Sequence, residues 1–177
     1  DMKAFLSITT YTFDIFYLEL FTPLLFGAQV VVLDKLSIRD GNRLQEAIEE
    51  YQPDFMQATP STWRMLIDSG WENKQDVTVL TGGEIISESL KNSLTSISTT
   101  VWNLYGVTEA TIWATAQKLK SSERVTIGNA MNNIQLYVLG ENASVLPIGV
   151  VGAIFIGGKL LSPGYLYRES LTKDKFV

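Results

Sequence analysis

The sequence contains no cysteine and no histidine. Without these residues, the chain can form no disulfide, no thiolate zinc site, no cysteine nucleophile and no catalytic triad that depends on imidazole. The absence of cysteine is also consistent with a reducing compartment, and we expect the chain to act in the cytoplasm.

Basic residues and long apolar runs are scarce as well. The net charge is −5, from 14 Lys and Arg against 19 Asp and Glu. With no basic cluster or stripe, the sequence argues against a nucleic-acid groove and against a membrane surface. Asp14, Glu19 and Gln29 interrupt the longest apolar stretches, so no membrane span is predicted. The opening DMKAFLSITTYTFD lacks the basic start and apolar block of a signal peptide.

What is present is enough apolar material for a core. Hydrophobic residues make up 46% of the 177 positions, which suits one good-sized globular domain. Both ends look interrupted, because the chain opens without a natural start and closes within the helix-like run LTKDKFV. We interpret the chain as part of something longer, and we expect this portion to be inactive by itself.

Helix and strand signals alternate along residues 1–125. The segment 13–27 predicts a buried helix that ends at Gly27, and Asp40, Thr59 and Ser87 each predict the start of a further helix. Apolar, β-branched runs between these helices predict buried strands at 28–34, 54–58, 77–83 and 99–106.

This alternation predicts an α/β fold with a parallel sheet covered by helices. A further strand is expected near residues 112–117. The remaining segment, residues 126–177, is rich in strands and turns, with strands expected at 134–140 and 152–158.

Polar loops follow three of the predicted strands. Open α/β sheets bind ligands beyond the carboxyl ends of their strands, and the loops in question read QATPST, TGGE and LYGVTEAT. The double glycine of TGGE allows the backbone to approach a flat ligand. In the third loop, Tyr105 offers an aromatic face, Thr108 a hydroxyl for phosphate and Glu109 an oxygen ligand for magnesium. The alternative is an ordinary turn whose polar side chains cap neighbouring backbone.

Six sequence blocks occur in a family-specific order. They are FD-x3-LELF-x-PLL-x-GA, ATPSTWR-x-L, TGGE, N-x-YG-x-TEATIWAT, IG followed by YVL, and IGG-x5-GYL-x-R-x-x-LT-x-x-KFV. Together they resemble the adenylation domains of nonribosomal peptide synthetases, over essentially the whole chain. Within that resemblance, the fold is part of the large N-terminal subdomain of an adenylate-forming enzyme.

The resemblance implies an activity. Such domains activate a carboxylic acid with ATP and Mg²⁺ and pass the acyl-adenylate to a phosphopantetheine thiol on a peptidyl carrier domain, next to a condensation domain. By resemblance, Asn103 and Tyr105 hold adenine, Thr108 touches phosphate, and Glu109 ligates magnesium. The other nucleotide-site positions are Gly83, Glu84 and Gly106.

The same resemblance implies a substrate pocket. Its positions are Asp14, Ile15, Leu18, Gln57, Leu80, Gly82, Leu104, Ile112 and Trp113. Read as the string DILQLGLIW, they resemble the pattern for glycine, with cysteine or alanine next. Asp14 would pair with the substrate ammonium, whereas acyl- and aryl-acid CoA ligases tend to lack it. The alternative is that Asp14 caps its helix.

The sequence departs from the family at a few positions. Val107 stands where proline is usual, and further departures fall at Ala153, Leu160, Pro163 and the pair Asn129-Ala130. The resemblance places the family's phosphate loop before residue 1, and its ribose-binding aspartate and catalytic lysine after residue 177. Two alternatives remain: a CoA ligase of the same superfamily, and a nucleotide-binding module without turnover.

Overall fold

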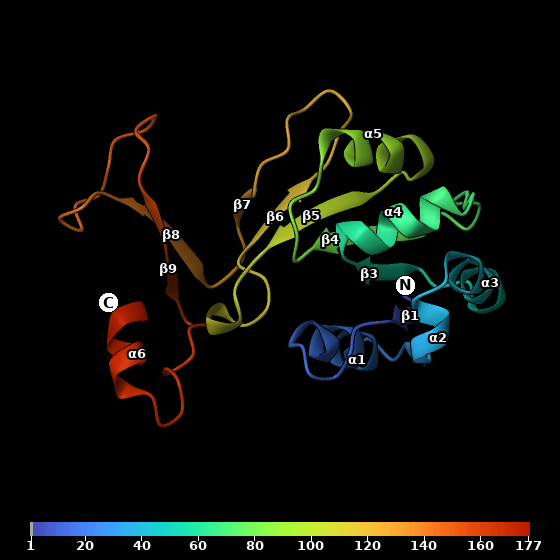
Figure 1. Cartoon of the computed structure of the whole chain (residues 1–177), viewed down its shortest axis with the longest axis horizontal. Helices are drawn as coiled ribbons and strands as arrows, with labels where there is room; N and C mark the ends of the chain where they lie inside the picture. The colour runs from blue at the N-terminus through green and yellow to red at the C-terminus, as the bar shows by residue number, and fades with distance from the viewer. Residues whose placement is uncertain (1) are drawn as a thin grey trace. The chain divides into compact units, whose positions relative to one another are not determined.

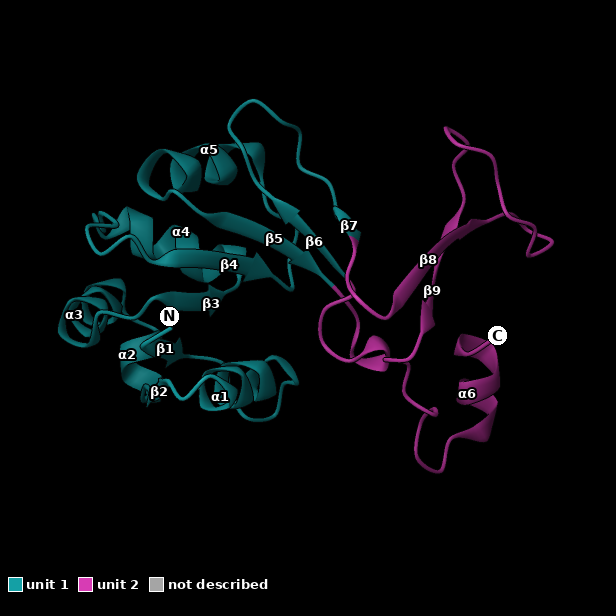
Figure 2. Ribbon diagram, turned by 180° about the vertical axis from the view of Figure 1, so that it is seen from behind, with its two compact units in different colours: residues 1–105, 115–129 teal, residues 106–114, 130–177 magenta. Residues whose placement is uncertain are grey.

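The computed structural model describes residues 2–177 (Figure 1). The chain forms two compact units, drawn in teal and magenta in Figure 2. Unit 1 comprises the chain up to Tyr105 together with Thr115–Asn129, and unit 2 comprises Gly106–Ala114 together with Ala130–Val177. The chain therefore leaves unit 1 directly after a strand, returns to it, and leaves it again.

Unit 1 is built on a seven-stranded sheet with the order β2-β1-β3-β4-β5-β6-β7. Its pairs from β2 to β5 are parallel, and β6 is antiparallel to β5. This arrangement confirms the predicted α/β class. The strands are β1 (Ala4–Ser7), β2 (Gln29–Val32), β3 (Phe55–Ala58), β4 (Thr78–Gly82), β5 (Val101–Tyr105), β6 (Thr115–Lys118) and β7 (Asn129–Ala130).

Helices connect the parallel strands, and α3, α4 and α5 lie side by side over the sheet (Figure 1). Three predicted caps are confirmed: Asp40 accepts from Asn42 N–H, Thr59 from Thr62 N–H, and Ser87 from Leu90 N–H. The helices of unit 1 are α1 (Ile15–Leu25), α2 (Lys35–Ile38), α3 (Gly41–Tyr51), α4 (Pro60–Asp68) and α5 (Glu88–Ile97).

The core lies between one face of the sheet and helices α3, α4 and α5. Neighbouring strands place Leu6 beside Met56, Met56 beside Val79, and Val79 beside Val101. All four side chains belong to one buried cluster, which also contains the helix residues Leu44, Ile48, Trp63, Leu66, Leu90 and Leu94. This face therefore provides hydrophobic stability and leaves the opposite face for other uses.

Two expectations about burial are wrong. In the predicted buried helix α1, only Glu19 and Pro23 are buried, while Phe21 and Leu25 are exposed. The reason is that α1 packs against β1 and β2, which cover only part of a helix that is apolar on most sides. The run at 28–34 predicted a buried strand, but β2 lies at the sheet edge and Val32 is exposed.

Short elements were not predicted. These are β1, α2 and β7. Each has four residues or fewer, too few for a hydrophobic period to stand out.

Unit 2 contains the two strands that the sequence predicted, β8 (Ile134–Leu139) and β9 (Ala153–Gly158), and the structure pairs them antiparallel. A short 3-10 turn, η1 (Thr108–Ala110), and the closing helix α6 (Glu169–Lys175) complete it. Within residues 2–177, no helix of either unit is long and apolar enough to span a bilayer.

Candidate functional site

The predicted ligand-binding loops of unit 1 begin at one edge of its sheet. Strands β3, β4 and β5 run parallel, with Gln57 paired to Leu80 and Gly82 paired to Leu104. Their carboxyl ends therefore lie together, and the TPST and GGE segments both leave from this edge. This is where open α/β sheets bind ligands.

Four predicted pocket residues share one face of this sheet. Paired residues on neighbouring strands project to the same side, and so do residues two apart on one strand. By this register, Gln57, Leu80, Gly82 and Leu104 lie on the same face, opposite the core cluster.

Helix α1 covers that same face. Leu6 of β1 pairs with Met56 on the core side, so the next residue, Ser7, points to the other side. The Ser7 hydroxyl donates to Glu19 of α1 at 2.9 Å, which places the helix there. The three pocket residues predicted on or beside α1, namely Asp14, Ile15 and Leu18, are all half-buried. The structure thus brings together the seven predicted pocket residues of unit 1 on one side of its sheet.

Asp14 occupies the N-cap position of α1 without acting as a cap. Its side chain makes no capping hydrogen bond. The alternative that Asp14 caps its helix is therefore not realised. Asp14 also has no ion-pair partner in the described part of the chain. A half-buried carboxylate with no internal partner is suited to pair with a cation from a ligand.

Glu19 of α1 has a structural role that was not predicted from the sequence. This side chain is fully buried, and its Oε2 accepts from Ser7 Oγ, Ile8 N and Thr9 N at 2.9 to 3.0 Å. The Thr9 hydroxyl donates to Oε1. Burial raises the pKa of the Glu19 carboxyl, and these hydrogen bonds oppose the shift. The sequence did contain a sign of this role. A carboxylate within an apolar helix, when buried, needs hydrogen-bond or charged partners.

Gln57 presents an unpaired acceptor on the pocket face. The residue is 1% exposed, and its Oε1 has no hydrogen-bond partner among the residues described. A buried acceptor without a donor costs about 1–3 kcal/mol. A ligand donor reaching Gln57 would remove that cost.

The TGGE loop combines an open surface with an internal contact. Gly83 has φ +81°, and a Cβ placed there would meet nothing nearer than Thr59 Cγ2 at 4.0 Å. The Glu84 carboxylate accepts from Ser61 N at 3.1 Å and from Ser61 Oγ at 2.6 Å. Glu84 therefore caps the first turn of α4, alongside the nucleotide-site role that the resemblance implies.

Asn103 lies on the core side of the sheet, opposite to Leu104. It is buried, and its side-chain nitrogen donates to the Thr126 carbonyl at 2.7 Å. This bond ties the end of β5 to the segment that follows β6. The predicted contact of Asn103 with adenine remains a prediction.

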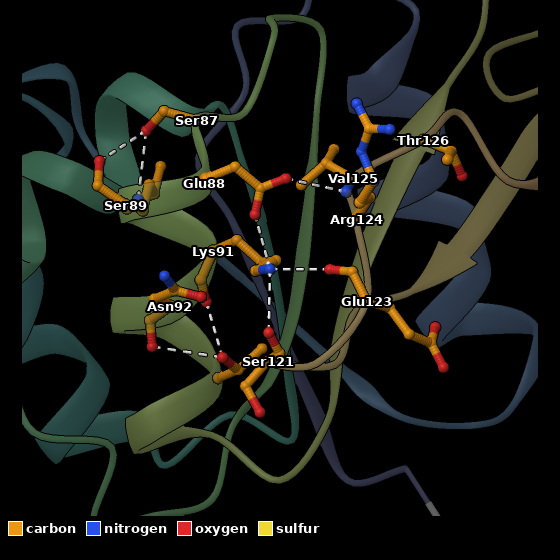
Figure 3. Close-up of polar contacts among 12 residues, drawn as sticks. Ser87, Glu88, Ser89, Lys91, Asn92, Ser121, Glu123, Arg124, Val125 and Thr126 are labelled. Atoms are coloured by element: carbon orange, nitrogen blue, oxygen red, sulfur yellow. Dashed lines mark hydrogen bonds and ion pairs between the residues drawn. The ribbon is translucent and has the colours of Figure 1, made fainter.

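A buried lysine supports that segment and was not predicted (Figure 3). Lys91 of α5 is 3% exposed, pairs with Glu88 at 2.7 Å, and donates to the carbonyls of Ser121 and Glu123. The Val125 N–H in turn donates to Glu88 at 3.1 Å. Lysine is rarely buried, so composition gave no reason to single it out.

The β5 loop, defined as residues 106–113 in unit 2, folds back tightly on itself. A Cβ at Gly106 would lie 2.0 Å from the Ile112 carbonyl oxygen, so only glycine fits. Thr111 and Ile112 adopt φ values of +58° and +73°, and this conformation is strained for a β-branched side chain. The loop leads to Trp113, which is 5% exposed and whose buried Nε1 has no partner in the described residues.

Two chemically useful side chains sit in the turn of this loop. The Thr108 side chain is exposed, and Glu109 is half-buried. The Tyr165 hydroxyl donates to Glu109 Oε1, and this hydrogen bond lowers the pKa of the Glu109 carboxyl. Glu109 is therefore a carboxylate at neutral pH. It borders a cavity of about 500 Å³ within unit 2, lined also by Val107, Ala110, Ile154, Tyr165 and Phe176.

Glu109 fits a magnesium ion shared with a phosphate substrate. No group of three or more acidic, histidine or cysteine side chains gathers anywhere in residues 2–177 to hold a metal alone. Magnesium often uses only one or two protein carboxylates and completes its shell with substrate phosphates and water. A single ionised carboxylate beside a free hydroxyl matches that requirement.

Comparisons with known proteins agree with the sequence resemblance. A family profile described as AMP-binding enzyme matches residues 2–166. The chain is 41% identical, over 97% of its length, to a dimodular nonribosomal peptide synthase from Bacillus subtilis (strain 168). It is 36% identical, over 97% of its length, to a hybrid polyketide–nonribosomal peptide synthetase from Aspergillus candidus.

Solved structures give the same result. A four-domain nonribosomal peptide synthetase bound to AMP and glycine matches 96% of the chain, with a TM-score of 0.93 and 39% identity. A synthetase protein with adenylation and carrier domains matches 98%, with a TM-score of 0.84 and 27% identity. The chain spans 7% of the length of both curated relatives and 13% and 37% of these two structures. The chain belongs to the AMP-binding enzyme family, among the adenylation domains of nonribosomal peptide synthetases.

Proposed function

We propose that this chain contributes the amino-acid pocket and part of the nucleotide site of an enzyme that converts an amino acid and ATP into aminoacyl-AMP and pyrophosphate. The β5 loop carries this proposal, because it presents an exposed hydroxyl at Thr108 and an ionised carboxylate at Glu109 within one turn. Such chemistry requires positioning and charge neutralisation more than a protein nucleophile.

Each group has a simple role in this proposal. Magnesium, when bound, would neutralise phosphate charge. Glu109 would hold that ion, Thr108 would donate a hydrogen bond to phosphate, and Tyr105 would lie against adenine together with Asn103. The open backbone at Gly83 would allow close approach of the nucleotide. Glu84 and Gly106 would complete the contacts from this chain.

Asp14 would select the class of acid. Its unpartnered carboxylate at the start of α1 would receive the α-ammonium of an amino acid, a group that fatty and aryl acids lack. The unpaired Gln57 Oε1 would offer a further acceptor on the same face of the sheet. These two features favour an amino-acid substrate over the substrate of a CoA ligase.

Glycine is the proposed substrate, with cysteine or alanine next. Most residues proposed to line the pocket are bulky and apolar, and only Gly82 lacks a side chain. Such a pocket would leave little room for a substrate side chain. The similar four-domain synthetase was solved with AMP and glycine bound, which supports the same choice. One methylene changes binding by about 1–3 kcal/mol, so we expect alanine to be activated as well, at a lower rate.

The product would pass to a phosphopantetheine thiol on a carrier domain, with a condensation domain forming the peptide bond. One similar structure joins adenylation and carrier domains, which supports this pairing. Because the reaction consumes ATP, we propose a cytoplasmic location.

Amino-acid-dependent ATP–pyrophosphate exchange by the full-length protein tests the proposal. We expect glycine to give the highest rate in a panel of amino acids, fatty acids and aryl acids. Exchange with fatty or aryl acids alone would instead identify a CoA ligase. Binding of ATP without exchange under any condition would identify a module without turnover.

A further inference from the structure

Tyr165 reaches Glu109 across 56 positions of sequence, and its hydroxyl donates to Glu109 Oε1. Both residues lie in unit 2. The tyrosine belongs to the segment 159–168, which follows β9 and precedes α6. In the sequence, Tyr165 stands out only as part of the GYL block.

The same segment also holds the backbone around Glu109. Ser162 N donates to the Glu109 carbonyl at 2.8 Å, and Thr111 Oγ1 donates to the Leu160 carbonyl at 2.6 Å. The main chain on either side of the carboxylate is thereby fixed to the segment that supplies the tyrosine. With the backbone fixed, the remaining freedom of Glu109 lies in its own side-chain torsions.

Tyr165 is itself held in place. Its N–H donates to Thr172 Oγ1 at 2.9 Å, and its ring meets Phe176 edge-on, with centroids 5.6 Å apart. Neither contact uses the hydroxyl. A phenylalanine at position 165 would therefore keep the packing and lose only the hydrogen bond to Glu109.

A metal-binding carboxylate benefits from such a support. Magnesium demands near-ideal octahedral geometry, and outer partners that orient a ligand typically change metal affinity by about 10–100-fold. Oε1 of Glu109 is engaged by Tyr165, whereas Oε2 receives no side-chain hydrogen bond within residues 2–177. We infer that Tyr165 is a positioning residue that fixes the Glu109 carboxylate so that Oε2 faces a divalent cation. The inference rests on the proposed metal role of Glu109.

Direct metal binding separates the possibilities. The experiment measures Mn²⁺ affinity by electron paramagnetic resonance, in the presence of ATP, for the full-length protein and for Tyr165→Phe, Glu109→Gln and the double variant. Tyr167→Phe is the matched control, since that side chain is 93% exposed and lies two residues away. Thermal unfolding of each variant confirms that it is folded.

We expect Tyr165→Phe to weaken Mn²⁺ binding about tenfold, with Tyr167→Phe unchanged. The double variant should bind no more weakly than Glu109→Gln, because the tyrosine acts only through the carboxylate. If Glu109→Gln loses affinity while Tyr165→Phe matches the parent, the positioning role is wrong and the metal assignment stands. If Glu109→Gln itself leaves Mn²⁺ affinity unchanged, the metal assignment is wrong and the inference fails with it.

Discussion

Helix α1 carries two carboxylates five positions apart, and the protein treats them in opposite ways. Glu19, in the middle of the helix, is fully buried and accepts hydrogen bonds from Ser7, Ile8 and Thr9. Asp14, at the helix start, is half-buried and receives none from the described chain. A carboxylate whose partners are all internal supports structure, whereas one without internal partners is free to meet a ligand.

The loops after β4 and β5 repeat this contrast. Glu84 accepts twice from Ser61 and so serves the start of α4. Glu109 accepts one side-chain hydrogen bond, from Tyr165. The two carboxylates therefore differ in the supply of internal partners.

The largest expected effect belongs to Glu109. We expect Glu109→Gln in the full-length protein to lower ATP–pyrophosphate exchange by about 100-fold or more, because the amide is a poor magnesium ligand and loses several kcal/mol of charge stabilisation. The fold should persist, since the amide is isosteric and the site is half-buried.

Exchange kinetics alongside thermal unfolding check this result. Glu72→Gln is the matched control, because that carboxylate is 72% exposed, pairs with Lys74 and has no assigned role in the site. A Glu109→Gln variant within a few-fold of the parent would show that the carboxylate is not a metal ligand.

The next largest effect is expected at Asp14. Removing one partner of a desolvated charge pair costs about 2–5 kcal/mol, so Asp14→Ala should reduce exchange by about 30-fold or more with every amino acid alike. All amino acids share the ammonium, so their ranking should stay the same. A substrate panel measures both quantities. A changed ranking at undiminished overall rates would contradict the proposed pairing.

Local signals in the sequence predicted much of this architecture. The caps at Asp40, Thr59 and Ser87 depend on neighbouring residues only, and each is confirmed. The strand and helix alternation likewise predicted the parallel sheet.

Properties that depend on distant contacts could not be predicted in this way. The hydroxyl that meets Glu109 comes from Tyr165, 56 positions away, and the two carbonyls that accept from buried Lys91 lie 30 and 32 positions away. The exposure of α1 depends on which strands it packs against. The spacing of apolar residues along the helix does not indicate those strands. The pocket and nucleotide roles came from resemblance, and they remain predictions.

Glu19, the buried carboxylate of α1, should affect the stability of the fold rather than catalysis. Glu19→Ala leaves the N–H groups of Ile8 and Thr9 without their acceptor in a buried site, which should lower the free energy of unfolding by about 2–4 kcal/mol. Glu19→Gln keeps an oxygen in place and should lose less. Chemical denaturation of the three proteins gives the comparison. Equal stability of Glu19→Ala and the parent would contradict a structural role.

The pH dependence of stability sharpens the same test. Burial raises the pKa of Glu19 in the folded state above its ordinary value. A raised folded pKa contributes stability below the unfolded pKa, and that contribution is lost as pH rises through the folded value. The parent should therefore lose stability over that interval relative to Glu19→Gln, which has no titrating group there. Parallel pH profiles for the two proteins would show that Glu19 titrates normally.

The smallest expected effect concerns Trp113, where packing rather than charge is at stake. Its ring is buried and its Nε1 makes no hydrogen bond within the described chain, so its substitution removes volume without breaking a polar contact. If Trp113 closes the pocket, Trp113→Ala should shift preference from glycine towards larger apolar amino acids. We expect a few-fold change in relative exchange rates, because a new cavity is useful only when the substrate fills it well. Trp113→Phe, which removes less volume, should shift the ranking less. Because both variants can also lose stability, the ranking of amino acids within each variant is the measurement, and absolute rates are not. An unchanged ranking in Trp113→Ala would remove Trp113 from the pocket and leave the role of Asp14 intact.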